Sequence, residues 1–318
     1  MREHSSQVND NCVVLSEAEL ECAGPVSRTT SRPPDVAERV TVRRRADLPG
    51  VEHWRVEAST RLWAVYHERY AFCVAHRSAG PQAWRYRRRV FEMNAHTSTM
   101  LIIPGEVHVT TQVPLSSFQV LMMDPAVVKR ELAEETPTVH CDFSGGQTDQ
   151  PIVARHFLSL CRAIEDAHAD NFERRALLRQ FLFAALRAEH DKPPQPIRTG
   201  CERAVMQVRE MISSCIGENL TLELFEQVTN VSKYYLERSF QAKVGVPIHR
   251  YLKLVRLERA QELLRSGCSA TETAHRTGFF DSAHMNRAFK AELGITPGAY
   301  ARSPGALIDP VSGEPGRA

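Results

Sequence analysis

The stretch 269–300 constrains this chain more than any other part of its sequence. It divides into a short helix, a glycine turn, a second helix and a Pro-Gly stop. Ser269 can cap the first helix, and Glu272 three residues later completes a capping box. Gly278 can take the left-handed backbone conformation that a tight turn between two helices requires. The pattern predicts a helix-turn-helix, the unit that lays an α-helix in the major groove of DNA.

The second helix of this unit carries the predicted DNA contacts. Asp281 or Ser282 is expected to cap it. Met285 and Phe289 lie four residues apart and are predicted to face the core. The side chains that we expect to meet DNA from this helix are Ser282, Ala283, His284, Asn286, Arg287 and Lys290.

A fainter copy of the same unit lies earlier in the chain. Thr221 can cap its first helix, and Asn230 stands at the turn, where asparagine tolerates a positive φ. Its second helix is predicted over 232–242, with Leu236 and Phe240 on the core side. The predicted DNA contacts of this helix are Lys233, Tyr234, Glu237 and Arg238. The chain therefore contains an internal repeat of one supersecondary unit.

Each outward residue type has a chemistry that fits DNA. Arg238 and Arg287 can hold guanine O6 and N7 with two hydrogen bonds, and Glu237 can accept one from cytosine N4. A phosphate, or a carboxylate within the motif, is the alternative partner for both arginines, and a solvated helix surface is the alternative for Glu237. Tyr234 can contact the backbone or a thymine methyl group, and Asn286 is expected near the backbone. The lysines of both helices are predicted to position the protein on phosphates.

A helix predicted over 248–266 joins the two motifs. Its apolar residues cover more than one face, so we expect each side to be buried against one motif. At 1.5 Å per residue it spans roughly 28 Å, and one turn of DNA is about 34 Å. The two reading helices can therefore reach successive major grooves on one side of a duplex.

The residues of this region resemble the DNA-binding domain of the AraC/XylS family of bacterial transcription regulators over about 201–302. The chain departs from the family pattern at Glu226, where a small residue like Ala274 is usual, and at Thr273 and Met285. The first motif therefore matches the family pattern less closely than the second. The matching residues are Ser232, Leu236, Arg238, Phe240, Gly245, Pro247, Tyr251, Leu252, Arg256, Leu257, Ala260, Leu263, Leu264, Ala274, Gly278, Phe279, Arg287, Phe289, Lys290, Gly294, Pro297 and Tyr300.

The rest of the chain has a different pattern. From 36 to 125, β-branched and aromatic residues alternate with polar ones between Pro-Gly breaks, which is typical of a β-sandwich or barrel. Two amphipathic segments within 151–190 predict an αα-hairpin. The predicted organisation is α+β, and its boundaries are a mobile arm at 1–35, a β and αα-hairpin domain at 36–190, a proline-stiffened linker at 191–200, the DNA-binding domain at 201–302 and a disordered tail at 303–318.

The resemblance implies more about the N-terminal half. In the family this half is a cupin-like β-barrel that binds an effector, with helices beside it that form a homodimer. Glu106-Val107-His108 after Gly105 is similar to part of that barrel's second motif, and Met123-Asp124-Pro125 is similar to a strand end in relatives. Candidate pocket residues are Tyr66, Phe72, Trp84 and His108, and the alternative for each is ordinary barrel core.

Composition sets further bounds. The chain has 318 residues, a net charge of +2 and eight cysteines without a C-x-x-C pair, so free thiols in the cytoplasm are expected. It has no apolar run of the roughly 20 residues that a membrane span needs and no signal-peptide core. Residues 201–302 hold 14 Lys and Arg against 11 Asp and Glu, a net +3, which favours few phosphate contacts.

Three functional interpretations remain. The first is a sequence-specific transcription regulator, an activator that works with RNA polymerase and responds to a small molecule. The second is a DNA-binding regulator without ligand control. The third is a cupin enzyme fused to a DNA-binding domain. Because no H-x-H pair, Ser/His/Asp spacing or P-loop is present, we expect no metal, no cofactor and no catalytic residue.

Overall fold

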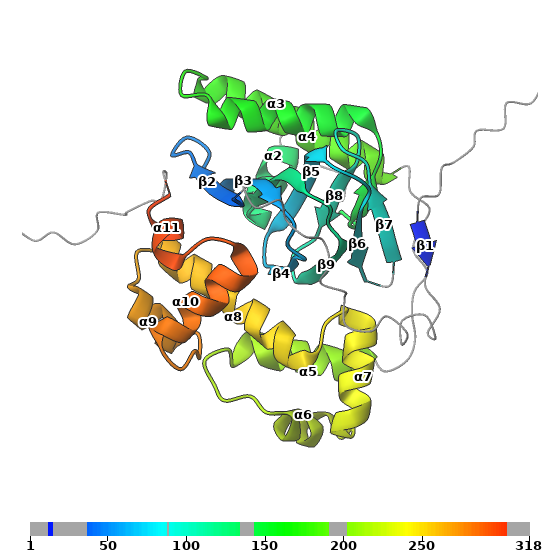
Figure 1. The fold of residues 1–318 in the computed structure, drawn as a ribbon, viewed down its shortest axis with the longest axis vertical. Coiled ribbons are helices and arrows are strands. Elements are labelled where there is room, and N and C mark those ends of the chain that lie inside the picture. Colours follow the sequence, from blue (N-terminus) through cyan, green and yellow to red (C-terminus); the bar gives the residue numbers. More distant parts are fainter. Residues whose placement is uncertain (1–11, 15–36, 88, 134–142, 191–201, 304–318) are drawn as a thin grey trace, which may run out of the picture.

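The computed structural model describes residues 12–14, 37–87, 89–133, 143–190 and 202–303 (Figure 1). The predicted linker at 191–200, nearly all of the predicted tail and most of the predicted arm lie outside these residues. Within the arm, strand β1 (Cys12–Val14) is described and pairs with β7 (Arg89–Met93), which differs from the predicted mobility. The free edge of a sheet offers backbone groups to which such a segment can bind.

The N-terminal half contains two antiparallel sheets. The five-stranded sheet has the order β1, β7, β6 (Gln82–Tyr86), β9 (Glu106–Gln112) and β4 (Ala64–His67). The six-stranded sheet has the order β11 (Gly146–Thr148), β8 (Thr99–Ile102), β5 (Tyr70–Ser78), β10 (Ser116–Met123), β3 (Val51–Ser59) and β2 (Arg39–Arg44). The predicted closed barrel is not seen in the described residues, because the edge strands of the two sheets do not pair with one another.

Pro-Gly breaks separate the strands as predicted. Gly50 adopts φ +80° between β2 and β3, and a Cβ atom there would lie 2.6 Å from Cγ2 of Val127. Gly80 and Gly105 likewise fall between strands. The alternation within β6, where every second residue is buried, shows the period of two that the sequence predicts.

The predicted αα-hairpin consists of α3 (Pro151–Glu165) and α4 (Asn171–His190). With α2 (Pro125–Ala133), it covers the six-stranded sheet. Phe157 and Phe181 are fully buried there and contact each other edge to face, and Phe181 also contacts Phe72 of β5. Ile152, which lies in the first of the two predicted amphipathic segments, is 40% exposed.

The C-terminal half is entirely helical in the described residues. Its elements are α5 (Glu202–Ser214), α6 (Leu222–Thr229), α7 (Lys233–Val244), α8 (Ile248–Arg265), α9 (Ala270–Arg276), α10 (Ser282–Leu293) and α11 (Pro297–Ala301). The predicted burial of α8 on two sides is confirmed. Tyr251 and Val255 belong to the core of the first motif, and Leu257 and Leu264 belong to that of the second.

These helices are docked on the β domain, at the end opposite the αα-hairpin (Figure 1). Tyr66 of β4 meets Tyr251 of α8 with ring centroids 5.4 Å apart. Trp54 of β3 meets Tyr300 of α11 at 5.6 Å. Two hydrophobic clusters therefore continue from the β domain into the helices, one for each motif.

A buried cluster of charges joins the same two parts. Glu52 of β3 accepts hydrogen bonds from Arg44 at 2.5 Å and from Arg69 at 3.0 Å, and the hydroxyl of Tyr300 donates to it at 3.0 Å. Arg265 of α8 lies 3.5 Å away. Burial alone would raise the pKa of Glu52, but the guanidinium groups of Arg69, Arg265 and Arg44 hold it far below its usual value.

No helix in the part of the chain that the structure describes is both long and apolar enough to cross a membrane. Cys73, Cys161, Cys215 and Cys268, all within the described ranges, are free thiols. This agrees with the expectation for those four residues.

Candidate nucleic-acid interface

The second motif forms where its local signals predict. The side-chain oxygen of Ser269 accepts a hydrogen bond from the backbone N–H of Glu272 at 3.2 Å and so caps α9. Gly278 has φ +71°, the left-handed conformation that the turn requires. Asp281, and not Ser282, caps α10 by accepting from the N–H of His284 at 2.6 Å.

The first motif repeats this design with different residues. Thr221 caps α6 by accepting from the N–H of Leu224 at 3.3 Å. Asn230 takes the turn position with φ +54°. Glu226, the departure from the family pattern, is half-buried. Its chain therefore still reaches solvent, as the side chain of a charged residue beside a helix crossing is expected to do.

Each reading helix is anchored by its inner edge. Leu236 and Phe240 of α7 are fully buried, and so are Met285 and Phe289 of α10. Because residues three to four apart share one face of a helix, burial of these pairs turns the residues between them toward solvent. The predicted core positions of both helices are confirmed.

The outer edge of α7 presents aromatic and charged side chains. Tyr234 is 82% exposed, and Arg238 is also exposed. The ammonium group of Lys233 donates to Glu223 at 2.9 Å, an exposed pair that must open before the lysine can meet a phosphate. Glu237 differs from these three. It is half-buried, and its Oε1 accepts a hydrogen bond from the N–H of Ile248 at 3.3 Å, at the start of α8. The side chain of Glu237 therefore already has a hydrogen-bond partner within the protein.

The outer edge of α10 is polar. Ala283, His284, Asn286 and Arg287 are exposed, and Ser282 is half-buried. The ring of His284 packs edge to face on Phe279 with centroids 5.4 Å apart, which orients the imidazole. The residue that we expected on a phosphate, Lys290, is exposed, but its Nζ donates to the carbonyl of Gly294 at 2.7 Å and so caps the end of the helix.

The C-terminal end of α10 is held by the β domain. The guanidinium of Arg61 donates to the carbonyl oxygens of Lys290, at 3.3 Å, and of Ala291. Arg61 is in turn paired with Glu38 at 2.5 Å. Leu293, the last residue of the helix, is buried. The β domain thus covers one end of α10 and leaves its reading edge open.

One exposed aromatic residue was missed by the sequence analysis. Phe280 is 93% exposed and directly precedes Asp281, the cap of α10. It follows a second phenylalanine, Phe279, which is buried. The sequence signal that could have revealed it is the pair of adjacent phenylalanines at a turn, because only one of the two can enter the core.

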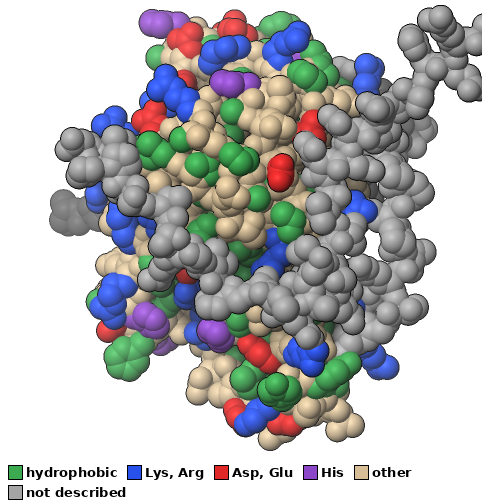
Figure 2. Space-filling view, turned by 45° about the vertical axis from the view of Figure 1, so that its right-hand side comes forward, with side chains coloured by type: hydrophobic (Ala, Val, Ile, Leu, Met, Phe, Trp, Pro, Cys, Tyr) green, Lys and Arg blue, Asp and Glu red, His purple; other side chains and the backbone are tan. Residues whose placement is uncertain are grey.

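Figure 2 shows acidic and basic side chains interspersed over the lower part of the molecule, where these helices lie.

Comparisons with known proteins agree with this geometry. A helix-turn-helix domain model matches residues 226–303, and an AraC-like ligand binding domain model matches residues 54–182. The chain belongs to the AraC family of transcription regulators. It is therefore a DNA-binding regulator with a ligand-binding domain, and this family comprises regulators and not enzymes.

Individual relatives of this AraC-family chain are distant. YbfI of Bacillus subtilis, an uncharacterized HTH-type transcriptional regulator, is 27% identical over 199 residues, which are 58% of this chain and 68% of YbfI. The HTH-type transcriptional activator RhaR of Salmonella dublin is 31% identical over 90 residues, 28% of this chain and 32% of RhaR. The crystal structure of ToxT from Vibrio cholerae bound to (E)-4-(8-methylnaphthalen-1-yl)but-3-enoic acid has a TM-score of 0.47 and 12% identity, covering 84% of this chain and 98% of ToxT.

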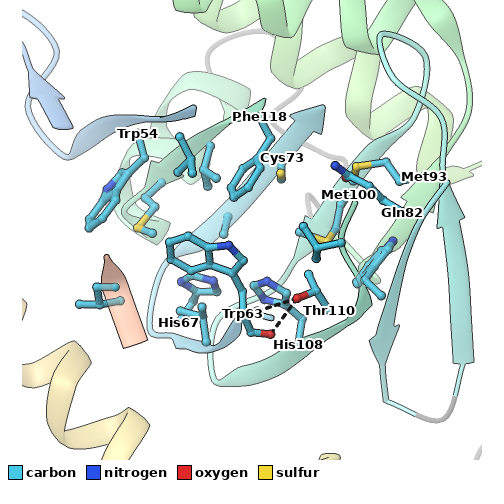
Figure 3. A pocket seen from close by; sticks show the side chains of 18 of the residues that line it. Trp54, Trp63, His67, Cys73, Gln82, Met93, Met100, His108, Thr110 and Phe118 are labelled. Carbon is cyan, nitrogen blue, oxygen red and sulfur yellow. Dashed lines mark hydrogen bonds between the residues drawn. The ribbon is translucent and has the colours of Figure 1, made fainter. Parts of the chain in front are cut away.

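The ligand-binding domain of this AraC-family chain contains a partly open cavity of about 70 Å³ between its two sheets (Figure 3). Of the four predicted pocket residues, Trp84 and His108 line it. Tyr66 packs instead on Tyr251 of α8, and Phe72 packs on Phe143 and Phe181.

Further lining residues were missed, although strand periodicity points to them. His67 and Val65 of β4, with Trp63 just before the strand, line the cavity. They alternate with Tyr66 because side chains two apart share a face of a strand. In the described part of the chain, no group of three or more His, Cys, Asp or Glu side chains is placed to hold a metal ion.

Proposed function

We propose that this chain is a dimeric transcription activator that reads DNA with α7 and α10 and responds to a small molecule bound in its β domain. The observation that carries the proposal is the arrangement of the two reading helices. Each buries one edge in its own motif and leaves the opposite edge exposed, although both motifs are docked on the β domain. Activation is supported by relatives such as RhaR, which is described as a transcriptional activator. RNA polymerase is the partner that an activator of this kind would need.

Arginines are the proposed base readers of the two helices. Arg238 and Arg287 are exposed on the outer edges of α7 and α10. Lys233 and Lys290 are the proposed phosphate contacts, and each would exchange a partner within the protein for a phosphate oxygen. Glu237 is the weakest of the proposed readers, since it would have to give up its bond to the start of α8.

The experiment compares Arg287→Ala with Lys290→Ala on a duplex selected by the full-length protein from a random pool. Arg287→Ala should weaken binding to the selected duplex by about 1–3 kcal/mol and relax the preference at one base pair. Lys290→Ala should weaken binding to selected and random duplexes by the same factor, because a phosphate contact carries no sequence information. Wild-type affinity of Arg287→Ala would contradict its proposed role.

The αα-hairpin is the proposed dimer surface. Its outer side carries Ile152 and Phe172, which are 40% and 83% exposed, beside Arg175 and Arg179. It lies away from the DNA-binding helices, so two copies can pair there while both read DNA (Figure 1). Phe172→Ser should yield monomers in sedimentation at concentrations where the wild type is dimeric. Leu182 is fully buried, so its substitution would report on folding instead. A dimer that Phe172→Ser leaves intact would remove this surface from the proposal.

A further inference from the structure

The cavity of the β domain has an apolar lining with an unusual concentration of large side chains. All three tryptophans of the chain, Trp54, Trp63 and Trp84, line it. Their indole N–H groups are satisfied elsewhere, by Glu52, Ser59 and Gln147. The tryptophan rings therefore offer the cavity flat apolar surface and no free donor.

The polar side chains that line the cavity are two histidines, the amide of Gln82, the thiol of Cys73 and the hydroxyl of Thr110, which is already bonded to the backbone of Trp63. His67 and His108 stack with ring centroids 5.4 Å apart, and Figure 3 shows them side by side. Both ring nitrogens of His67, Nδ1 of His108 and Nε2 of Gln82 are buried without a hydrogen-bond partner among the described residues. A buried polar group without a partner is costly, so these atoms favour a ligand that can donate or accept a hydrogen bond.

The surroundings of the cavity disfavour a charged ligand. None of the described residues that line the cavity is Asp, Glu, Lys or Arg. Burial lowers the pKa of His108 to about 4 and holds the pKa of His67 well below its usual value, so both rings are neutral near pH 7. An ionised ligand would lose its hydration without gaining a counter-charge.

The cavity is too small for a ring-sized ligand unless part of its wall moves, and one residue of that wall belongs to a DNA-binding helix. A volume of about 70 Å³ is less than the roughly 150 Å³ in which an engineered apolar cavity binds benzene. A ring-sized ligand must therefore displace part of the wall. Methionine side chains, here Met93, Met100 and Met122, are flexible enough to move. One further lining residue, Leu293, belongs to α10 and is the only one from the DNA-binding half among those described.

We propose that this cavity binds a small uncharged molecule, largely apolar with one hydroxyl or carbonyl group, and that Leu293 transmits its presence to the reading helix α10. This rests on the proposed function, in which the β domain senses a small molecule, and names the ligand class and the route. Arg61 fixes the end of α10 beside Leu293, so displacement of this leucine shifts the helix against the β domain.

Ligand class is tested first, on the full-length protein without DNA. Because every tryptophan lines the cavity, intrinsic fluorescence reports its occupancy directly. Benzyl alcohol and cyclohexanol are the probes, with sodium benzoate and glucose as the charged and polyhydroxylated comparisons. Both alcohols should give saturable changes, and neither benzoate nor glucose should do so at tenfold higher concentrations. His108→Phe should weaken benzyl alcohol binding about tenfold through loss of a hydrogen bond, and His168→Phe, at an exposed site on the hairpin, should not.

The absence of a saturable change with either alcohol would overturn the ligand class, as would benzoate binding as tightly as benzyl alcohol. These outcomes are independent of DNA. A chain that binds the alcohols but no specific duplex would instead contradict the proposed function.

The route is tested by measuring affinity for the selected duplex with and without saturating benzyl alcohol. The wild type should show a change of about fivefold or more, the lower range of allosteric coupling. Leu293→Ala should reduce this factor below twofold, and the conservative Leu293→Met, with an unchanged melting temperature, should retain it. The route through α10 would be overturned if benzyl alcohol left the DNA affinity of the wild type unchanged, or if it changed the affinities of Leu293→Ala and the wild type by the same factor.

Discussion

Replacing Glu52 by glutamine is expected to loosen the docking of the DNA-binding helices on the β domain. The carboxylate is 2% exposed and receives hydrogen bonds from Arg44, Arg69 and the hydroxyl of Tyr300. Glutamine keeps the size of the side chain but removes its charge. Glu258, whose own pKa is raised by burial, would then be the buried carboxylate left beside Arg69, at 3.6 Å.

The magnitude follows from the burial of the partners. Arg44 and Arg69 have side chains only 6% exposed, so solvent cannot replace the lost charge. Breaking a buried pair by removing one partner costs about 3–5 kcal/mol. Glu57→Gln is the matched control on the same strand. Its carboxylate pairs with Arg55 at a site where both side chains are about one-third exposed, and such pairs contribute about 0–1 kcal/mol.

The assay is urea unfolding followed by two signals. Tryptophan fluorescence reports the β domain, and circular dichroism at 222 nm mainly reports the helices. Glu52→Gln should shift both midpoints and separate them, because domains that no longer hold each other unfold independently. Coincident curves and a loss of less than about 1 kcal/mol, as in Glu57→Gln, would refute the conclusion that this cluster holds the two parts together.

Two further predictions concern the cavity and the reading edge. His108 has a pKa of about 4 in the folded protein, below its ordinary 6.5. Its stabilising contribution is therefore present above pH 6.5 and is lost as pH falls toward 4, by up to about 3 kcal/mol. His108→Phe should flatten the fall in unfolding free energy between pH 7.5 and 5, and an equal slope in both proteins would contradict this. Phe280→Ala should weaken binding to the selected duplex about tenfold, or ~1.4 kcal/mol, through loss of an apolar contact between this 93% exposed ring and DNA. Wild-type affinity of this variant would show that Phe280 does not meet DNA.

The helix-turn-helix motifs were predictable because their signals are local. The caps at Thr221, Ser269 and Asp281 bind backbone groups three residues away, and the turns at Asn230 and Gly278 depend on single residues with positive φ. Short-range chemistry of this kind can be read from adjacent letters of the sequence. The same reasoning predicted which face of each reading helix is buried.

Contacts between distant parts of the chain were not predictable. Glu52 and Tyr300 are 248 residues apart, and no periodicity connects them. Only two of the four predicted pocket residues, Trp84 and His108, line the cavity, for a related reason. Alternation along β4 separates Tyr66 from His67, but the sequence does not say which of the two faces points toward the other sheet and which meets α8. Closure of the sheets into the predicted barrel is not seen in the described residues, and sequence patterns do not report it because edge pairing depends on register between strands far apart in the chain.

Methylation protection of the selected duplex by the full-length protein tests most directly whether α7 and α10 read DNA together. Two motifs separated by α8 should give two protected major grooves per protomer, about 10 base pairs apart and on one side of the DNA. Arg238→Ala should remove one set of protected guanines and Arg287→Ala the other. A single protected groove per protomer, or loss of the same guanines in both variants, would contradict the claim that α7 and α10 read DNA together.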